Sequence, residues 1–465
     1  MWENIEQDRH YTGIFDILDE QLSGELIYNK KTGIIVLKII KQLTKKSFLG
    51  KSYGSLTKIT GKLNSGASIT LINNRCINNQ TKSFRSQQLI FKAEYMIWKN
   101  TENSCPQYNK MICILKNAYA WSRLTAFEES DSGLKTKKSA DIKECNWFGA
   151  KITFSTYLNN WFILPPKDEE TKIVQRLILE IELDNKQDLK SFISIRNKIL
   201  SLISFAIKDN VNIEEEYLLN YDDSYIVTKD FVDYHKHYLI TSDPQLNVTN
   251  NQIWDYNFTL NLLLTENDIN NELEKLEPIF NLYLSLFKYR DMPTEMVFLN
   301  IVQALETFHS RFFYEDKKSE YVKSVMERFG EHPNFEKIEK LLLCDTQKDK
   351  HCKYIILVSR LNDLLIGNYD LLFREYYEVN ENYAQTIADT RHYYTHYAKS
   401  KEAKALKNDD LLESIYILKL LLEYRICLVL GIDNCKKIGQ ELSNQNIGKQ
   451  LSEVQSQKPP QEINT

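Results

Sequence analysis

Glycine is scarce in this sequence, with 14 glycines among 465 residues, whereas tyrosine (27) and phenylalanine (21) are abundant. A chain of this composition should have packed cores and few flexible linkers. The chain is also longer than one hydrophobic core usually supports, so two to three domains are expected.

The sequence lacks a large charge excess of either sign. Lysine and arginine together number 59 and aspartate and glutamate 63, for a formal net charge of −4. This balance gives no overall attraction to nucleic acid, which weighs against a protein that coats RNA or DNA. Any contact with nucleic acid would have to come from a local basic patch.

Signals for metals, cofactors and membranes are missing. No Cys-x-x-Cys pair occurs, and His235 and His237 alternate without a third ligand nearby, so we expect no metal site. No P-loop, dinucleotide fingerprint or Gly-x-Ser-x-Gly elbow is present, so we expect no cofactor. The apolar run 33–40 is too short to cross a bilayer, and the first ten residues do not resemble a signal peptide. These absences predict a cytoplasmic protein with reduced thiols and no membrane contact.

The first 165 residues have the pattern of β-strands. Two hairpins are predicted, each with a turn that contains glycine; they join 24–29 to 34–40 and 55–60 to 67–72. Further strand patterns cover 111–115 and 151–155. We therefore expect a β-rich domain over 1–165.

The next segment, 166–267, mixes the two kinds of pattern. Residues 172–183 alternate like a strand, and residues 189–207 repeat apolar side chains at helical spacing. This predicts a mixed α/β subdomain over these residues. Its role as a sensor or regulatory region is implied by the family resemblance described below.

From about residue 268 the apolar residues repeat at helical spacing. The predicted helices cover 273–289, a segment from Pro293 to about 312, 318–329, 333–344, 351–366, 379–399 and 409–430. Asn408 or Asp409 is expected to cap the last helix, and Gly431 to end it. Residues 441–465 are polar and predict a disordered tail. The fold class is thus α+β multidomain, with an all-helical domain over 268–440.

The sharpest chemical feature is the segment 389–397, which contains Arg391 and His396 and is followed by several lysines. Metal-free RNA cleavage needs a group that moves protons and a cation that stabilises the phosphorane. Histidine does the first near neutral pH, and the planar guanidinium of arginine does the second.

Helix geometry restricts how this pair can act. Five residues of separation place the two side chains roughly 140° apart on a regular helix. Either the helix is distorted, or the pair flanks a cleft that a second subunit completes. On spacing alone, the commoner arrangement has His396 packed between helices and Arg391 paired with a surface carboxylate.

A family resemblance favours a catalytic role for Arg391 and His396 over this purely structural arrangement. The Arg-x4-His element follows an earlier helix with the sequence Leu299-Asn-Ile-Val-Gln-Ala-Leu-Glu306-Thr-Phe-His309, and together they resemble the Apea-type HEPN domain. The upstream elements Gly24-Glu-Leu, Ile59-Thr-Gly61, Ser68-Ile-Thr-Leu71 and Tyr157-Leu-x-x-Trp161 are similar to the N-terminal domain that accompanies it. The similarity covers most of residues 10–440 and identifies the chain as a member of the ApeA-type family of bacterial abortive-infection proteins.

The resemblance implies a HEPN ribonuclease of anti-phage defence that cleaves RNA without metal. It would act as a homodimer or higher homo-oligomer and respond to a phage-derived trigger. His396 would transfer protons and Arg391 would stabilise the transition state. His392 occupies a position where relatives often have asparagine, so it substitutes as a hydrogen-bond donor or is merely tolerated.

Other residues are assigned supporting or binding roles. Glu306 would orient Arg391 or His396, and Thr395 is a further supporting residue. Lys399 and Lys401 are candidates for binding the RNA substrate.

The expected reaction is attack by the ribose 2′-OH on the adjacent phosphate, which excludes DNA as a substrate. The rival hypothesis is a non-catalytic HEPN module that binds a partner or acts with an antitoxin. One such group carries a modified tyrosine two positions after the histidine. Here that position is Ala398, with Tyr397 directly after His396, so the match to that group fails.

Overall fold

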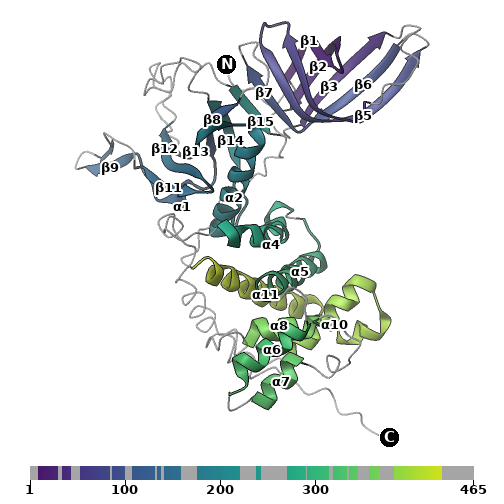
Figure 1. Ribbon diagram of the computed structural model, residues 1–465, viewed down its shortest axis with the longest axis vertical. Helices are drawn as coiled ribbons and strands as arrows, with labels where there is room; N and C mark the ends of the chain where they lie inside the picture. The colour runs from purple at the N-terminus through teal and green to yellow at the C-terminus, as the bar shows by residue number, and fades with distance from the viewer. Residues whose placement is uncertain are drawn as a thin grey trace. The chain divides into compact units, whose positions relative to one another are not determined.

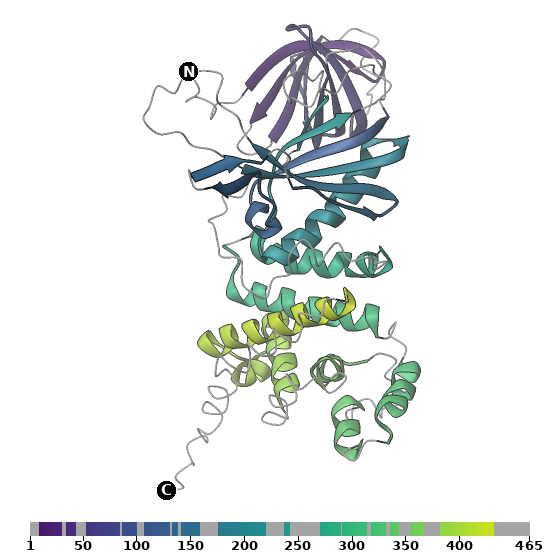
Figure 2. The same ribbon diagram turned by 90° about the vertical axis from the view of Figure 1, so that its left-hand side faces the viewer.

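The computed structural model divides the chain into two compact units, shown in Figures 1 and 2. One consists of Met1–Ile203 with Asn210–Ile253, and the other of Ser204–Asp209 with Trp254–Thr465. Strands dominate the first unit and helices the second, so the α+β class is confirmed. The domain boundaries expected at 165, 267 and 440 stay predictions. The structure describes residues 9–29, 34–42, 53–83, 86–99, 107–130, 133–137, 141–158, 175–219, 237–241, 270–289, 291–313, 318–331, 335–343, 355–366 and 382–431.

Six strands of the first unit close into a barrel. In hydrogen-bonding order they run β5-β4-β1-β2-β3-β6, and β6 pairs back onto β5. Both predicted hairpins are confirmed as the antiparallel pairs β2–β3 and β4–β5. The strands are β1 (Arg9–Ile17), β2 (Glu20–Asn29), β3 (Ile34–Gln42), β4 (Ser55–Leu63), β5 (Ser68–Ser83) and β6 (Ser86–Ala93).

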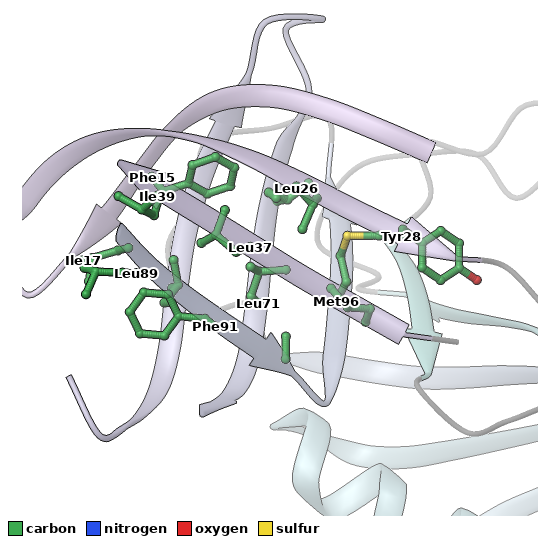
Figure 3. Close-up of a cluster of buried hydrophobic side chains, with 14 of the residues drawn as sticks. Phe15, Ile17, Leu26, Tyr28, Leu37, Ile39, Leu71, Leu89, Phe91 and Met96 are labelled. Atoms are coloured by element: carbon green, nitrogen blue, oxygen red, sulfur yellow. The ribbon is translucent and has the colours of Figure 1, made fainter. Parts of the chain in front are cut away.

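The barrel interior is filled by alternate side chains of these strands, as Figure 3 shows for Phe15, Leu37, Leu71 and Phe91 among others. Phe15 lies directly opposite Gly61 in the β1–β4 register. A Cβ on Gly61 would lie 2.5 Å from Phe15 Cδ1, so the glycine leaves the space that the ring occupies. This close approach explains why a strand interior contains glycine.

The sheet continues beyond the barrel through β7, which pairs with β5 and with β15. The order from there is β15-β14-β8-β13-β12-β11, again antiparallel. The further strands are β7 (Tyr95–Lys99), β8 (Tyr108–Leu115), β11 (Lys143–Trp147), β12 (Ala150–Leu158), β13 (Gln175–Gln187), β14 (Ile213–Leu219) and β15 (His237–Thr241). This unit also contains a short helix α1 (Tyr119–Ser122) and a two-stranded sheet of β9 (Phe127–Ser130) and β10 (Gly133–Thr136).

Helix α2 (Leu189–Ile207) forms over the residues that its periodicity predicts. Its Arg196 is 2% exposed and forms an ion pair with Glu216 of β14 at 2.5 Å. The Sγ atom of Cys113 on β8 contacts the same carboxylate at 3.5 Å. These contacts hold the helix against the β8–β14 part of the sheet.

The second unit is a bundle in which α5 packs against α4, α8, α10 and α11. Its helices are α4 (Asn270–Lys288), α5 (Thr294–Phe312), α6 (Lys318–Phe329), α7 (Phe335–Leu343), α8 (Leu357–Ile366), α10 (Tyr383–His396), η2 (Lys399–Lys404) and α11 (Asn408–Val429). These confirm the predicted helical segments, and Gly431 ends the last helix with φ +67° as expected. The expected tail over 441–465 lies outside the described residues.

Three predicted helix ends were wrong. Helix α8 starts at Leu357, so residues 355 and 356, which were expected within it, are not helical. The N-cap of α11 is Lys407, and Asn408, expected as a candidate cap, already belongs to the helix. Helix α10 ends at His396 and does not reach residue 399, because Tyr397 adopts a left-handed conformation with φ +49°. Tyr397 donates its N–H to the carbonyl of Tyr393, which closes the last turn.

A buried polar network ties α5 to α8 and α6. His309 Nε2 lies 2.9 Å from Asp363 Oδ2, and both side chains are fully buried. Arg328 donates to the same carboxylate from α6 at 2.8 Å.

None of the helices within the described ranges combines the length and the apolar character that a membrane-spanning helix needs.

Candidate functional site

The buried stripe of α10 determines which of its residues face outward. Tyr383, Ile387 and Thr390 are buried at helical spacing, and Tyr394 extends the stripe by an edge contact with Phe298 of α5, with ring centroids 6.4 Å apart. Residues on the opposite side of the helix are therefore directed away from the bundle.

His392 and His396 lie on that outward side and are both exposed. They are four residues apart, and their ring centroids lie 4.9 Å from each other. Thr395 is exposed as well, and its hydroxyl donates to the carbonyl of Arg391 at 2.7 Å. This bond uses the hydroxyl to satisfy the helix backbone, as threonines inside helices often do.

Arg391 lies at the edge of the buried stripe and is directed toward α5. Its Nη2 atom is 3.6 Å from Glu306 Oε2, with side-chain exposures of 40% and 31%. The helix is continuous from Arg391 to His396, so of the two options that the spacing left, a distorted helix is wrong. The two side chains leave a regular helix roughly 140° apart.

The chain after α10 folds back onto that helix. The backbone of Leu406 is held at both polar groups: its N–H donates to Thr390 Oγ1 at 3.0 Å, and its carbonyl accepts from the Tyr394 hydroxyl at 3.0 Å. The short helix η2 between Tyr397 and Leu406 consequently lies beside α10.

The lysines of this segment differ in their surroundings. Lys401 Nζ is 2.6 Å from Asp389 Oδ1, whose side chain is only 8% exposed. Lys407 lies 3.5 Å from Glu402 and over the ring of Tyr393. Lys399 is exposed to solvent. Residues 391–407 contain five lysine and arginine side chains and one carboxylate, so this surface is locally basic in a chain of net negative charge.

The expected site residues thus fall into groups. Arg391 and Glu306 are brought together, as are His392 and His396, whereas Lys401 is engaged by Asp389. Sequence reasoning gave no role to Asp389, Thr390 or Tyr394, which hold the η2 segment in place. The only signal for them was their position, since Thr390 and Tyr394 continue the apolar stripe with polar side chains.

The chemistry available here is that of imidazole and guanidinium groups. Exposed imidazoles can exchange protons with a bound ligand, and a guanidinium presents paired donors to an anion such as phosphate. No group of three or more His, Cys, Asp or Glu side chains within the described ranges is placed to hold a metal ion, and His235 lies outside those ranges.

Comparison with known families agrees with both halves of the chain. The family described as ApeA N-terminal domain 1 matches residues 10–276, and the family described as Apea-like HEPN matches residues 299–436. Neither the curated proteins nor the solved structures contain a match. Because the first match spans more than half of the chain and the second contains α5 and α10, the chain belongs to the ApeA-like defence proteins and carries an Apea-like HEPN domain.

Proposed function

We propose that this protein is a metal-independent endoribonuclease of anti-phage defence, which cleaves RNA through Arg391 and His396 and causes abortive infection. The observation that carries the proposal is the placement of His396, exposed at the end of α10, on the helix that also holds Arg391 against Glu306. An Apea-like HEPN domain is a setting in which ribonuclease activity is expected.

The proposed reaction is an internal transesterification. The ribose 2′-oxygen attacks its own 3′-phosphorus, the 2′-OH proton passes to a base, and the bond from phosphorus to the 5′-oxygen breaks as that oxygen gains a proton. The products are a 2′,3′-cyclic phosphate and a 5′-OH end. His396 transfers a proton, and Arg391 stabilises the charge that accumulates on the phosphoryl oxygens.

A second subunit is part of the proposal. Since α10 is regular between Arg391 and His396, the two side chains diverge and do not converge on one phosphate within a single helix face. A homodimer would allow Arg391 of one subunit to act with His396 of the other. Lys399 would contact the RNA backbone, whereas Lys401 would do so only by leaving Asp389.

The N-terminal unit is proposed as the sensor of a phage-derived trigger, and the cytoplasm as the site of action, where the RNA substrate is present. A ribonuclease that was active without a trigger would damage its own host. We therefore expect the resting protein to be inhibited.

The test is incubation of the purified full-length protein with total bacterial RNA in excess EDTA, with and without extract from phage-infected cells. The wild type is compared with His396→Ala and with His10→Ala, a change to an exposed histidine in the other unit. Cleavage by the wild type and His10→Ala, and none by His396→Ala, would support the proposal. Equal cleavage by all three would contradict the role of His396. RNA binding without cleavage under any condition would identify a non-catalytic binding module.

A further inference from the structure

We infer that His392 is a second catalytic residue, so that His392 and His396 divide the two proton transfers of RNA cleavage between them. This inference rests on the proposed function and adds to it a partner for His396 within the same helix.

The first argument is geometric. Residues four apart on a helix diverge by only roughly 40°, in contrast to the roughly 140° between Arg391 and His396. His392 and His396 are accordingly on one face, with ring centroids 4.9 Å apart and ring planes inclined by 55°. A single phosphate can contact both rings at once.

The second argument concerns the hydrogen bonds of the histidines. His309 is engaged by Asp363 at 2.9 Å, and His10 by Glu25 at 2.7 Å. Within the part of the chain that the structure describes, neither His392 nor His396 has a side-chain hydrogen bond to another residue, and their rings contact each other. Their ring nitrogens are therefore available to a ligand, as a structural histidine's would not be.

The third argument is chemical. The attacking 2′-oxygen loses a proton and the departing 5′-oxygen gains one, and the two oxygens lie roughly in line through the phosphorus. One group cannot serve both oxygens in the same step when they lie on opposite sides. Two imidazoles one turn apart can, one in its neutral form and the other in its protonated form.

Arg391 enters this arrangement from the second subunit of the proposed homodimer, because the Arg391 and His396 of one helix diverge. Its guanidinium is held near Glu306 with 40% of the side chain exposed. That cation would contact the non-bridging phosphoryl oxygens and leave the bridging oxygens to the histidines.

The test compares two substrates of equal size. One is an RNA oligonucleotide, and the other is the same RNA with sulfur in place of the 5′-bridging oxygen at the cleaved linkage. A thiolate leaves without being protonated, because a thiol is a far stronger acid than an alcohol. A variant that lacks only the general acid therefore still cleaves the sulfur-containing RNA.

The variants are His392→Ala and His396→Ala, with His10→Ala as the control, each checked for native circular dichroism. We expect both site variants to lose about 100-fold or more of the cleavage rate on ordinary RNA. One of the two, and only one, should cleave the sulfur-containing RNA within a few fold of the wild-type rate.

Two results would overturn the inference while leaving the proposed function intact. One is a His392→Ala variant that cleaves ordinary RNA within about threefold of the wild-type rate, as a tolerated residue would allow. The other is loss of cleavage by both variants on both substrates. A wild type that cleaves neither substrate, with or without extract from infected cells, would instead contradict the proposed function itself.

Discussion

Arg391 and Glu306 form a cross-helix ion pair in which Nη2 and Oε2 lie 3.6 Å apart and both side chains remain partly exposed. An exposed pair of this kind contributes at most about 1 kcal/mol to stability. Its consequence is positional, because the carboxylate restrains the guanidinium at the edge of α10 while leaving its outer donors accessible. A phosphate could contact those donors without displacing Glu306.

The first prediction concerns this pair. Glu306→Gln should reduce RNA cleavage about 10-fold, because Arg391 loses its restraint but keeps its charge. Arg391→Lys should reduce cleavage about 100-fold or more, since lysine cannot present paired donors to the phosphoryl oxygens. Single-turnover rates of both variants and of the double variant test this. If the losses of the two single variants add in the double variant, Glu306 does not act through Arg391, and the prediction is contradicted.

The second prediction concerns the buried end of the Lys401–Asp389 pair. Lys401→Met should lower the free energy of unfolding of the helical unit by about 1–3 kcal/mol, because the Asp389 carboxylate, only 8% exposed in the wild type, loses its cation. Lys404→Met, at an exposed position of η2, is the matched control and should change little. Thermal unfolding measures both, and equal midpoints for the two variants would contradict the assignment.

The third prediction concerns pH and the His309–Asp363 contact. Burial, the largest effect, lowers the pKa of His309 below the ordinary 6.5, although the hydrogen bond to Asp363 acts in the opposite direction. Below pH 6.5 the unfolded chain binds a proton that the folded protein does not, so stability falls as the pH drops. Above pH 6.5 His309 is neutral in both the folded and the unfolded protein, so this loss of stability disappears.

Asp363 also makes the protein less stable as the pH falls, but it does so at lower pH than His309. Burial alone would raise the pKa of this carboxyl, but the hydrogen bond from His309 and the charge of Arg328 outweigh it and lower the pKa below 3.8. Its contribution is complete above pH 3.8 and is lost as the pH falls toward the lowered value. Between pH 7 and 5, therefore, His309 dominates. His309→Gln should unfold with a shallower pH dependence over that interval, and curves parallel to the wild type would contradict this.

The fourth prediction concerns the barrel. Gly61→Ala should destabilise the N-terminal unit by about 1–3 kcal/mol, since its Cβ would lie 2.5 Å from the Phe15 ring. Adding Phe15→Leu, which removes the ring, should make the alanine less harmful than it is in the wild-type background. A Gly61→Ala cost that is unchanged in the Phe15→Leu background would show that the ring is not the cause.

Much of this architecture is predictable because its patterns are local. Helix α2 forms over the predicted residues 189–207, and two predicted hairpins form, since periodicity records which face of an element is buried. Closure of the barrel is different, because the β5–β6 and β1–β4 pairings join strands whose partners no local pattern specifies.

The site likewise has features that the local sequence predicts and features that depend on how distant parts of the chain fold together. The residue types and spacing of Arg391 and His396 identify a candidate for phosphate chemistry, and Glu306 was selected from an earlier helix by resemblance. The end of α10 was missed, because Tyr397 takes a left-handed conformation that usually belongs to glycine. The contact of Lys401 with Asp389 was also missed, since it depends on the chain folding back after that turn.

The most direct test of the central claim is analysis of the RNA ends that the wild type and His396→Ala produce in excess EDTA when extract from phage-infected cells is added as the trigger, with the extract alone as background. The account predicts 2′,3′-cyclic phosphate and 5′-OH ends from the wild type, no new ends from the variant, and no cleavage where the nucleotide before the cut carries a 2′-deoxy substitution. Ends with a 5′-phosphate, cleavage at 2′-deoxy positions, or undiminished cleavage by His396→Ala would contradict it.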